Sequence, residues 1–332
     1  MKQQSYFETH NGPQKRARLP RRRLMFAVAG SFLLISLATV ISPARLAAQK
    51  PAVSSQPKRI ATLVGALSQV DSVNPSGNMD AVVLVENGRL RQPYPEYNER
   101  AQRKFGREYF SPGKKYRVTF GGGEVGTATV KRFDMGCNNI HATLMVEDTS
   151  KIPAHLSALA TNSDSLGRKP SSRRAPTEAE REAVMKVVTQ IYRSRSTTLA
   201  MLRSLKTTNL TATDLNGDGE LELIGSFVIE TKNKARRDLL LIAEPQAATQ
   251  APQTDGLSGP AFKATLVRFQ AYKLPPEGFD SAIDFVDQLD LDGDGVAEVF
   301  VTQHGFDAYS YGIYKKSRGH WRQVYTTTGD AC

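Results

Sequence analysis

The chain has 332 residues, of which 40% are hydrophobic and 23% charged, a composition typical of a folded protein rather than a disordered one. Basic residues exceed acidic ones by 11, which would suit nucleic acid if they formed one surface. Residues 1–48 alone carry a balance of +7, however, and the other basic residues are scattered without interleaved aromatic residues. This distribution argues against nucleic-acid binding.

An uncharged apolar run from Leu24 to Ile41 follows the basic start. Basic residues beside such a run stay cytoplasmic, so we expect everything after residue 45 to be exported. Two alternatives stand for residues 1–48, because 18 residues suit either a signal-peptide core or a short transmembrane helix. The segment is a signal peptide cleaved near Ala44 or Ala48, or it anchors the chain in the inner membrane with its N-terminus cytoplasmic. The remainder is then periplasmic or extracellular.

Export would place the two cysteines, Cys137 and Cys332, in an oxidising compartment. In an oxidising compartment they are a disulfide candidate that would close a loop of about 195 residues, a constraint of about 4–5 kcal/mol on the chain-entropy model. The alternative is two unpaired thiols, one of them at a frayed terminus.

Residues 59–150 predict a small α+β domain to which the sequence assigns no function. Its expected elements are strands at 81–85, 116–120 and 127–130 and an amphipathic helix at 99–110. The segment Gly121 to Gly126 has the three-glycine spacing of a dinucleotide-binding fingerprint. That fingerprint requires a helix after the glycines, whereas a strand pattern follows here. The segment therefore predicts a hairpin and not a nucleotide site.

A polar, proline-containing stretch, 160–176, predicts a linker before a domain that spans 177–332. Thr177 and Glu180 form a capping box in front of an apolar stripe, which predicts a helix at 178–194 packed on a sheet. Two groups of four strands follow, at 207–213, 221–230, 237–243 and 262–273, and at 283–289, 297–303, 308–315 and 320–326. The fold class is therefore mostly β with a few helices, ending in a helix-capped two-unit antiparallel β domain.

One motif occurs twice in this domain, 76 residues apart. Asp214-Leu-Asn-Gly-Asp-Gly-Glu-Leu-Glu222 recurs as Asp290-Leu-Asp-Gly-Asp-Gly-Val-Ala-Glu298. Side-chain oxygens at positions 1, 3, 5 and 9, a backbone carbonyl at position 7, and glycines at 4 and 6 suit a hard cation such as Ca²⁺. The expected ligands are Asp214, Asn216, Asp218, Glu220 and Glu222 in the first loop and Asp290, Asp292, Asp294, Val296 and Glu298 in the second. The second loop has four carboxylates at positions 1, 3, 5 and 9 and the first has three, so we expect stronger cation binding in the second loop.

Neither loop is an EF-hand, because position 12 is Gly225 or Val301 instead of glutamate and a strand pattern follows each loop. The motif and its flanks, about 207–230 and 283–305, resemble the calcium loops of FG-GAP or VCBS-type repeats known from integrin-like β-propellers. The resemblance implies structural Ca²⁺ between paired strands. The alternative is a pair of metal-free turns, because Asn-Gly and Asp-Gly pairs form hairpin turns unaided.

The sequence holds no nucleophile elbow, phosphate loop or two-histidine zinc spacing. The preferred hypothesis is an envelope protein whose β domain binds an unknown protein or glycan at the cell surface. The alternative is a secreted hydrolase or its accessory module, with a cleft near His304, Asp307 and Tyr311. A purely structural periplasmic domain is the third possibility.

Overall fold

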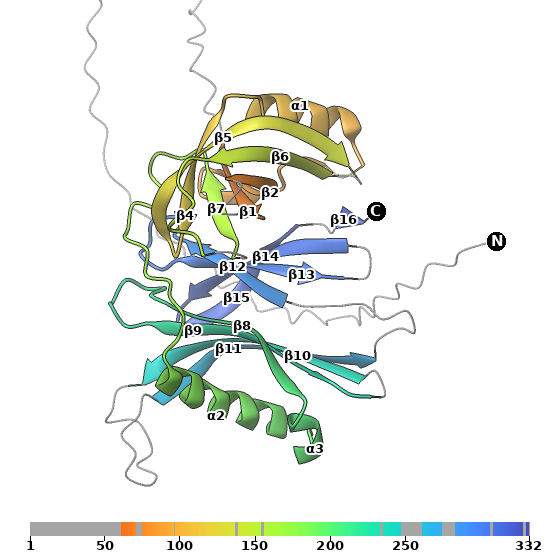
Figure 1. The fold of residues 1–332 in the computed structure, drawn as a ribbon, viewed down its shortest axis with the longest axis vertical. Coiled ribbons are helices and arrows are strands. Elements are labelled where there is room, and N and C mark those ends of the chain that lie inside the picture. The colour runs from red at the N-terminus through yellow and green to blue at the C-terminus, as the bar shows by residue number, and fades with distance from the viewer. Residues whose placement is uncertain are drawn as a thin grey trace, which may run out of the picture. The chain divides into compact units, whose positions relative to one another are not determined.

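The computed structural model describes residues 61–70, 75–95, 97–136, 139–153, 156–232, 235–246, 261–273, 283–305, 308–327 and 330–331. These residues contain sixteen strands and three helices, so the prediction of a mostly β fold is confirmed (Figure 1). They belong to one compact unit, Lys58–Cys332. None of the helices within these ranges is long and apolar enough to cross a membrane. The apolar run, Cys137, Cys332 and Asp307 lie outside the described residues.

The first sheet is a closed antiparallel barrel. Its strands are β1 (Thr62–Ser68), β7 (Ala158–Thr161), β4 (Lys115–Phe120), β5 (Gly123–Gly136), β6 (Asn139–Val146) and β2 (Ser76–Glu86), in that order. The ring closes because β1 pairs with β2 as well as with β7. A short strand, β3 (Arg89–Arg91), extends β2. The predicted glycine-rich hairpin joins β4 to β5, with positive φ angles at Gly121 and Gly122.

The helix α1 (Glu99–Tyr109) belongs to the barrel and confirms the helix predicted there. It begins at Asn98, whose side chain accepts a hydrogen bond from the backbone N–H of Ala101 at 3.0 Å. Phe105 and Tyr109 are buried in the barrel core and stack on each other with ring centroids 4.6 Å apart. The helix is therefore fixed by its apolar face as well as by its cap.

The stretch expected to be a linker is part of the folded structure. The strand β7 begins beyond the predicted end of the first domain and lies between β1 and β4, with all four residues buried. Further along, Arg173 is almost fully buried, with its guanidinium 4.6 Å from the Phe120 ring centroid and 4.5 Å from that of Phe285. Its Nη1 donates to the carbonyl of Val286 at 2.7 Å. The polar composition predicts an exposed stretch here, because the sequence does not distinguish an arginine that is buried by ion pairing and stacking from one that is exposed to solvent.

The remaining strands form two four-stranded meanders of the same order, as predicted. One contains β8 (Leu205–Thr213), β9 (Glu222–Glu230), β10 (Ala235–Gln246) and β11 (Ala261–Lys273). The other contains β12 (Ile283–Leu289), β13 (Glu298–His304), β14 (Ala308–Ser317) and β15 (His320–Thr326), with β16 (Asp330–Ala331) paired to β14. Their bounds differ from the expected ones by a few residues, mostly because the strands run longer.

The β12–β15 sheet shares one apolar core with the barrel and another with the β8–β11 sheet. The first core joins Val64, Val82 and Leu159 to Val286, Phe300 and Ile313. The second joins Ile224, Leu240 and Ile242 to Phe285, Val299 and Val301. Because both faces of the β12–β15 sheet are covered at β12 and β13, successive residues of these two strands are buried, whereas most residues of β15 are exposed.

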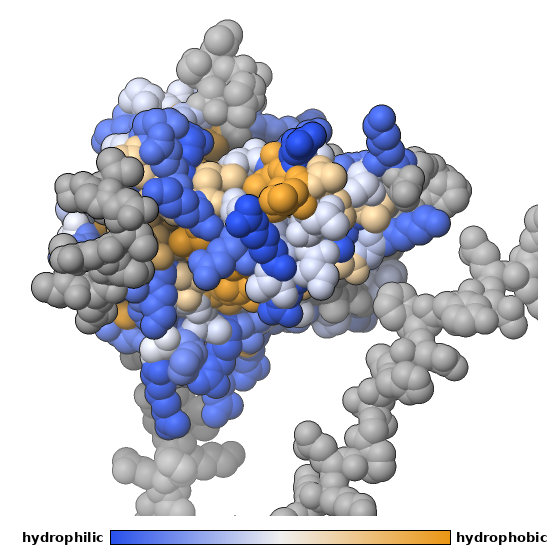
Figure 2. All heavy atoms as spheres, turned by 90° about the horizontal axis from the view of Figure 1, so that it is seen from below, coloured by the Kyte–Doolittle hydropathy of each residue, from blue (hydrophilic) through white to orange (hydrophobic). Residues whose placement is uncertain are grey.

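The predicted helix at 178–194 is α2 (Glu178–Ser194), and both hydrogen bonds of its capping box are present. Val184, Val188 and Tyr192 are buried against the free face of the β8–β11 sheet, and the Tyr192 hydroxyl donates to the Phe227 carbonyl at 3.0 Å. A short helix, α3 (Leu199–Leu202), follows. Figure 2, seen from below, shows a largely hydrophilic surface with small hydrophobic patches, a pattern normal for a folded protein.

Candidate metal loops and a polar pocket

Each Asp-rich loop joins two neighbouring antiparallel strands, as the sequence predicts. The first loop, residues 214–222, connects β8 to β9, and the second loop, residues 290–298, connects β12 to β13. The position-9 residues, Glu222 and Glu298, are the first residues of β9 and β13. Position 12 lies within a strand in both cases, which agrees with the exclusion of an EF-hand.

The two loops share one backbone frame, centred on the aspartate at position 1. In the first loop Asp214 accepts hydrogen bonds from the backbone N–H groups of Gly217 and Gly219 at 2.6 and 3.0 Å. In the second loop Asp290 accepts from the same positions, 4 and 6, at 2.8 and 3.1 Å. The glycines at these positions have φ angles of 76° and 85° in the first loop and 76° and 93° in the second. These positive φ values explain why the motif requires glycine there.

The glutamate at position 9 closes each loop in the same way. Glu222 Oε2 accepts from the Leu215 backbone N–H at 2.7 Å, and Glu298 Oε2 accepts from that of Leu291 at 2.8 Å. Both glutamates are 2% exposed. One oxygen of each carboxylate is therefore committed to the backbone, which leaves the other to face the loop centre.

The two loops also lie side by side, which nothing in the sequence indicates. The Ala297 backbone N–H donates to the Leu215 carbonyl at 2.7 Å, and Gln288 Nε2 donates to the Asp214 carbonyl at 2.8 Å. Lys169, from the stretch predicted to be a linker, donates to the Gly295 carbonyl at 3.1 Å. The two loops are therefore in direct contact through hydrogen bonds.

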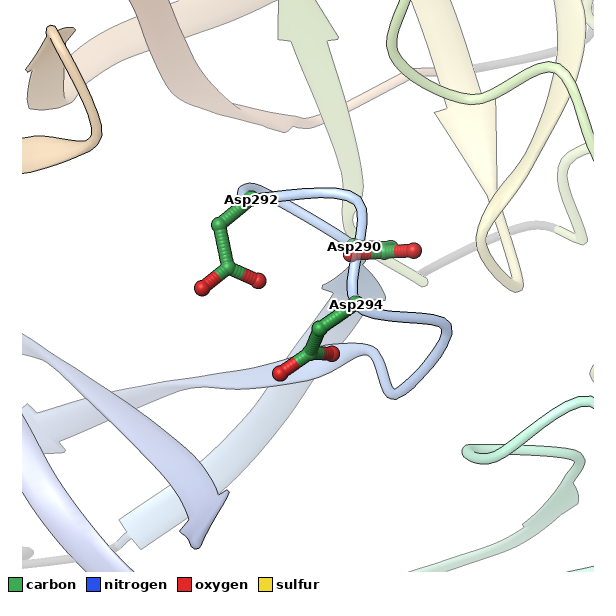
Figure 3. Close-up of side chains that lie close together, drawn as sticks. All are labelled: Asp290, Asp292 and Asp294. Atoms are coloured by element: carbon green, nitrogen blue, oxygen red, sulfur yellow. The ribbon is translucent and has the colours of Figure 1, made fainter.

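The second loop gathers carboxylates around a cation that the chain itself supplies. Ligand oxygens of Asp290, Asp292 and Asp294 lie within 4.8 Å of one another, and Figure 3 shows these side chains projecting from one turn. The Nζ of Lys315, on β14, lies 2.8 Å from oxygens of Asp292, Asp294 and Glu298. Burial lowers the pKa of Lys315, but these hydrogen bonds outweigh burial and raise that pKa above its ordinary value.

The first loop has a carboxylate in the place of this lysine. Tyr314 pairs with Val299 in the second unit, so the next residue on β14 is Lys315. In the first unit Ala243 pairs with Leu223 at the same loop position, so the corresponding residue on β10 is Glu244. Among the described residues, no lysine or arginine forms an ion pair with a first-loop carboxylate.

An amide bridges the first loop instead of an ammonium ion. Asn216 Nδ2 donates to Asp218 at 2.9 Å and to Glu222 at 3.1 Å. Burial raises the pKa of Glu222 to about 7, and the charges of Asp218 and Glu244 act in the same direction. Burial also raises the pKa of Glu298, but there the hydrogen bond from Lys315 opposes it. The oxygen donors of both loops fit a hard cation, and the first loop is the less neutralised of the two.

A polar pocket of about 610 Å³ lies between the barrel and the β12–β15 sheet, with a contribution from β8. Asp80, on β2, accepts hydrogen bonds there from His141 Nδ1 at 2.5 Å and from the hydroxyls of Tyr311 and Tyr309 at 2.6 and 3.0 Å. His304 lies on the same wall, with its Nε2 4.0 Å from Asp284.

The sequence hypothesis of a cleft near His304 and Tyr311 named two residues that do line this pocket. It missed Asp80 and His141, which lie far from Tyr309 and Tyr311 along the chain, Asp80 by 229 and 231 residues. No sequence pattern joins residues at that separation, so only the packing of the barrel on the β12–β15 sheet reveals the cluster.

Comparisons of the chain with protein-family models, with curated protein sequences and with solved structures give no match. The function is therefore argued from the loops and the pocket themselves.

Proposed function

We propose that this chain is an exported or membrane-anchored envelope protein that acts as a binding module, with Ca²⁺ as a structural ion in its Asp-rich loops. The observation that carries the metal proposal is the ammonium ion of Lys315 among three carboxylates of the second loop. A loop that gathers carboxylates around one cation, on a frame repeated in the first loop, has the charge and donor chemistry that Ca²⁺ requires. The resemblance to FG-GAP or VCBS-type loops supports the same proposal.

Bound Ca²⁺ would be coordinated by the side-chain oxygens at positions 1, 3, 5 and 9, all carboxylates except that of Asn216, and by the backbone carbonyl oxygen of position 7, Glu220 or Val296. In the second loop Lys315 must leave, which its flexible and 25% exposed side chain permits. In the first loop the Asn216 side chain must rotate so that its amide oxygen, and not its NH₂ group, faces the ion. Each ion would stabilise the strand pair that its loop joins by about 1–2 kcal/mol at millimolar Ca²⁺.

A calcium titration of the full-length chain, followed by its thermal midpoint, tests the metal proposal. We expect the midpoint to rise with Ca²⁺ and to rise less with Mg²⁺, which demands stricter octahedral geometry. The double variants Asp214→Ala/Asp218→Ala and Asp290→Ala/Asp294→Ala should each remove part of the rise. A midpoint that Ca²⁺ leaves unchanged, or a rise that survives both double variants, contradicts the proposal.

Export is supported by the charge asymmetry around the apolar run, Leu24 to Ile41. A reporter phosphatase that is active only outside the cytoplasm, fused after residue 58, should be active in a bacterial host. Replacing two apolar residues of the run, Leu33 and Leu34, by arginine should abolish that activity, while the same fusion stays expressed. An active fusion that carries both arginines would contradict export through this segment.

A hydrolase is the second candidate, and the pocket favours it over a purely structural domain. His141 is oriented by Asp80 through Nδ1, and its side chain is 37% exposed beside the two tyrosines. Such an arrangement is the one that orients a general base. Hydrolysis of chromogenic esters or glycosides by the native chain, abolished by His141→Asn, would establish the enzyme. Equal rates for the native chain and this variant would reject it.

A further inference from the structure

The pocket between the barrel and the β12–β15 sheet has a composition that differs from the rest of the molecule. The chain carries a net charge of +11, yet among the residues that the structure describes no lysine or arginine lines this pocket. Its ionisable lining residues are two carboxylates, Asp80 and Asp284, and two histidines, His141 and His304. An anionic ligand would therefore meet carboxylates without a lysine or arginine to balance its charge.

Both carboxylates already face an imidazole. Asp80 accepts from His141 and from two tyrosine hydroxyls, and Asp284 lies 4.0 Å from His304 Nε2. A cationic ligand would have to compete with these contacts. The charged groups of the pocket therefore serve to orient its neutral groups, which are the groups left to select a ligand.

The neutral lining consists of amide and hydroxyl side chains beside aromatic rings. Gln69, Asn78 and Asn209 contribute amides, and Ser68, Thr208 and Thr302 contribute hydroxyls. Each of these groups both donates and accepts hydrogen bonds, as the hydroxyls of a sugar do. The ring of Tyr309 stands edge-to-face on Tyr311 at 5.8 Å, with an interplanar angle of 88°. Both rings are held by Asp80, so the wall is organised before a ligand arrives.

One polar atom of this wall is left without a partner. The Asn209 Oδ1 is buried and accepts no hydrogen bond within the described residues. A buried amide oxygen that lacks a donor costs about 1–3 kcal/mol, so a turn of the Asn209 side chain that lets a ligand in the pocket donate to this oxygen would be favourable. A sugar hydroxyl is such a donor and carries no charge.

We propose that this pocket binds an uncharged oligosaccharide of a few sugar rings. Its volume lies within the range of small-molecule sites, roughly 300–1,000 Å³. The proposal rests on the proposed role as a binding module and names the class of partner, but it does not require Ca²⁺ in the loops. Because the walls come from three sheets, the ligand would also bridge the barrel, the β12–β15 sheet and β8.

Calorimetric titration of the full-length chain tests this inference with three uncharged trisaccharides: maltotriose, cellotriose and triacetylchitotriose. Spermidine and trigalacturonic acid serve as cationic and anionic probes of comparable size. We expect at least one uncharged trisaccharide to bind more tightly than either charged probe. Tighter binding of a charged probe, or binding of none of the three trisaccharides, would overturn the proposal.

Two variants locate the binding. Asn209→Leu removes the unpartnered oxygen and should weaken the trisaccharide about tenfold or more. Thr207→Val, on the same strand but outside the pocket lining, is the matched control and should bind as the native chain does. Equal binding by Asn209→Leu, with an unchanged thermal midpoint, would overturn the proposal. If Ca²⁺ raises the thermal midpoint but no sugar binds, only the sugar-binding proposal is refuted. If a sugar binds but Ca²⁺ has no effect, only the Ca²⁺ proposal is refuted.

Discussion

The first and second loops follow the same nine-residue pattern and fold on the same hydrogen-bonded frame, yet they meet opposite charges on the neighbouring strand. Lys315 lies beside the second loop, and Glu244 occupies the corresponding position beside the first. The number of carboxylates favours Ca²⁺ binding in the second loop, whereas the charge on the neighbouring strand favours Ca²⁺ binding in the first. The comparison shows that a loop motif specifies the donor atoms, while the strand next to it sets the charge that a cation must replace.

The two loops therefore balance the charge of their carboxylates in two different ways. The second loop pairs its carboxylates with an ammonium ion, whereas in the first loop burial raises the pKa of Glu222 to about 7 and so favours the protonated form of that one carboxylate. Four changes, from the largest expected effect to the smallest, separate these two ways.

Lys315→Met should have the largest effect, because it leaves the buried carboxylate of Glu298 without its cation. Breaking a fully buried pair costs about 3–5 kcal/mol, and the partial exposure of Lys315 reduces our expectation to about 2–3 kcal/mol in chelator. Millimolar Ca²⁺ should restore most of this loss, as measured by urea denaturation. Lys115→Met, which removes an exposed ion pair with Glu147 on the barrel, is the control, and any loss of stability in it should not be restored by Ca²⁺.

A loss of stability in Lys315→Met that Ca²⁺ leaves unrepaired would show that the lysine is a structural partner and not a substitute for a metal. That outcome would favour the metal-free interpretation of the second loop.

Glu222 should make the stability of the chelated protein depend on pH. Burial raises its pKa from 4.5 to about 7, so the folded state holds this proton more tightly than the unfolded chain does. Its contribution is then complete below pH 4.5 and is lost as the pH rises to about 7, a loss of roughly 3 kcal/mol at most. Glu222→Gln should remove this dependence and stabilise the chelated protein at pH 8.

Glu298→Gln should change the stability of the chelated protein in the opposite direction at pH 8, because it removes a negative charge that pairs with the ammonium ion of Lys315. Urea denaturation of both variants between pH 5 and pH 8 in chelator provides the comparison. If both variants stabilise the protein equally, the two loops do not differ in the way proposed.

Glu244→Lys transfers the cation of the second loop to the first. With the second loop disabled by Asp290→Ala/Asp294→Ala, we expect Ca²⁺ affinity at the first loop to fall about tenfold, a change of about 1.4 kcal/mol. Glu244→Gln, which removes the negative charge without adding a positive one, should reduce the affinity by less. Calorimetry measures both, and an unchanged affinity in Glu244→Lys would place residue 244 outside the electrostatic reach of the site.

Substitutions at position 7 should have the smallest effect on stability and Ca²⁺ affinity, because only the backbone carbonyl of this position would face a cation. Glu220→Val and Val296→Glu exchange the side chains of the two loops, and each should change stability by less than about 0.5 kcal/mol. A loss of Ca²⁺ affinity in Glu220→Val beyond about threefold, a change of about 0.7 kcal/mol, would mean that the Glu220 carboxylate is itself a ligand.

Local features of this protein follow from the sequence alone. The capping box at Thr177, the glycine turn at Gly121, the eight strands of the two meanders and the position of each Asp-rich loop between strands all match the structure. These features depend on backbone preferences and on periodicities within ten or so residues, which a single sequence displays directly.

Only the tertiary structure decided which residues surround the candidate sites. In the folded chain β7 lies within the barrel, and Arg173 is buried between two aromatic rings. Lys315 contacts the second loop, and Asp80 accepts hydrogen bonds from Tyr309 and Tyr311. Each of these contacts depends on strand pairing or packing between distant segments. The nine-residue motif therefore determined the donor set of the loops, and the pairing of β9 with β10 and β13 with β14 determined their charge.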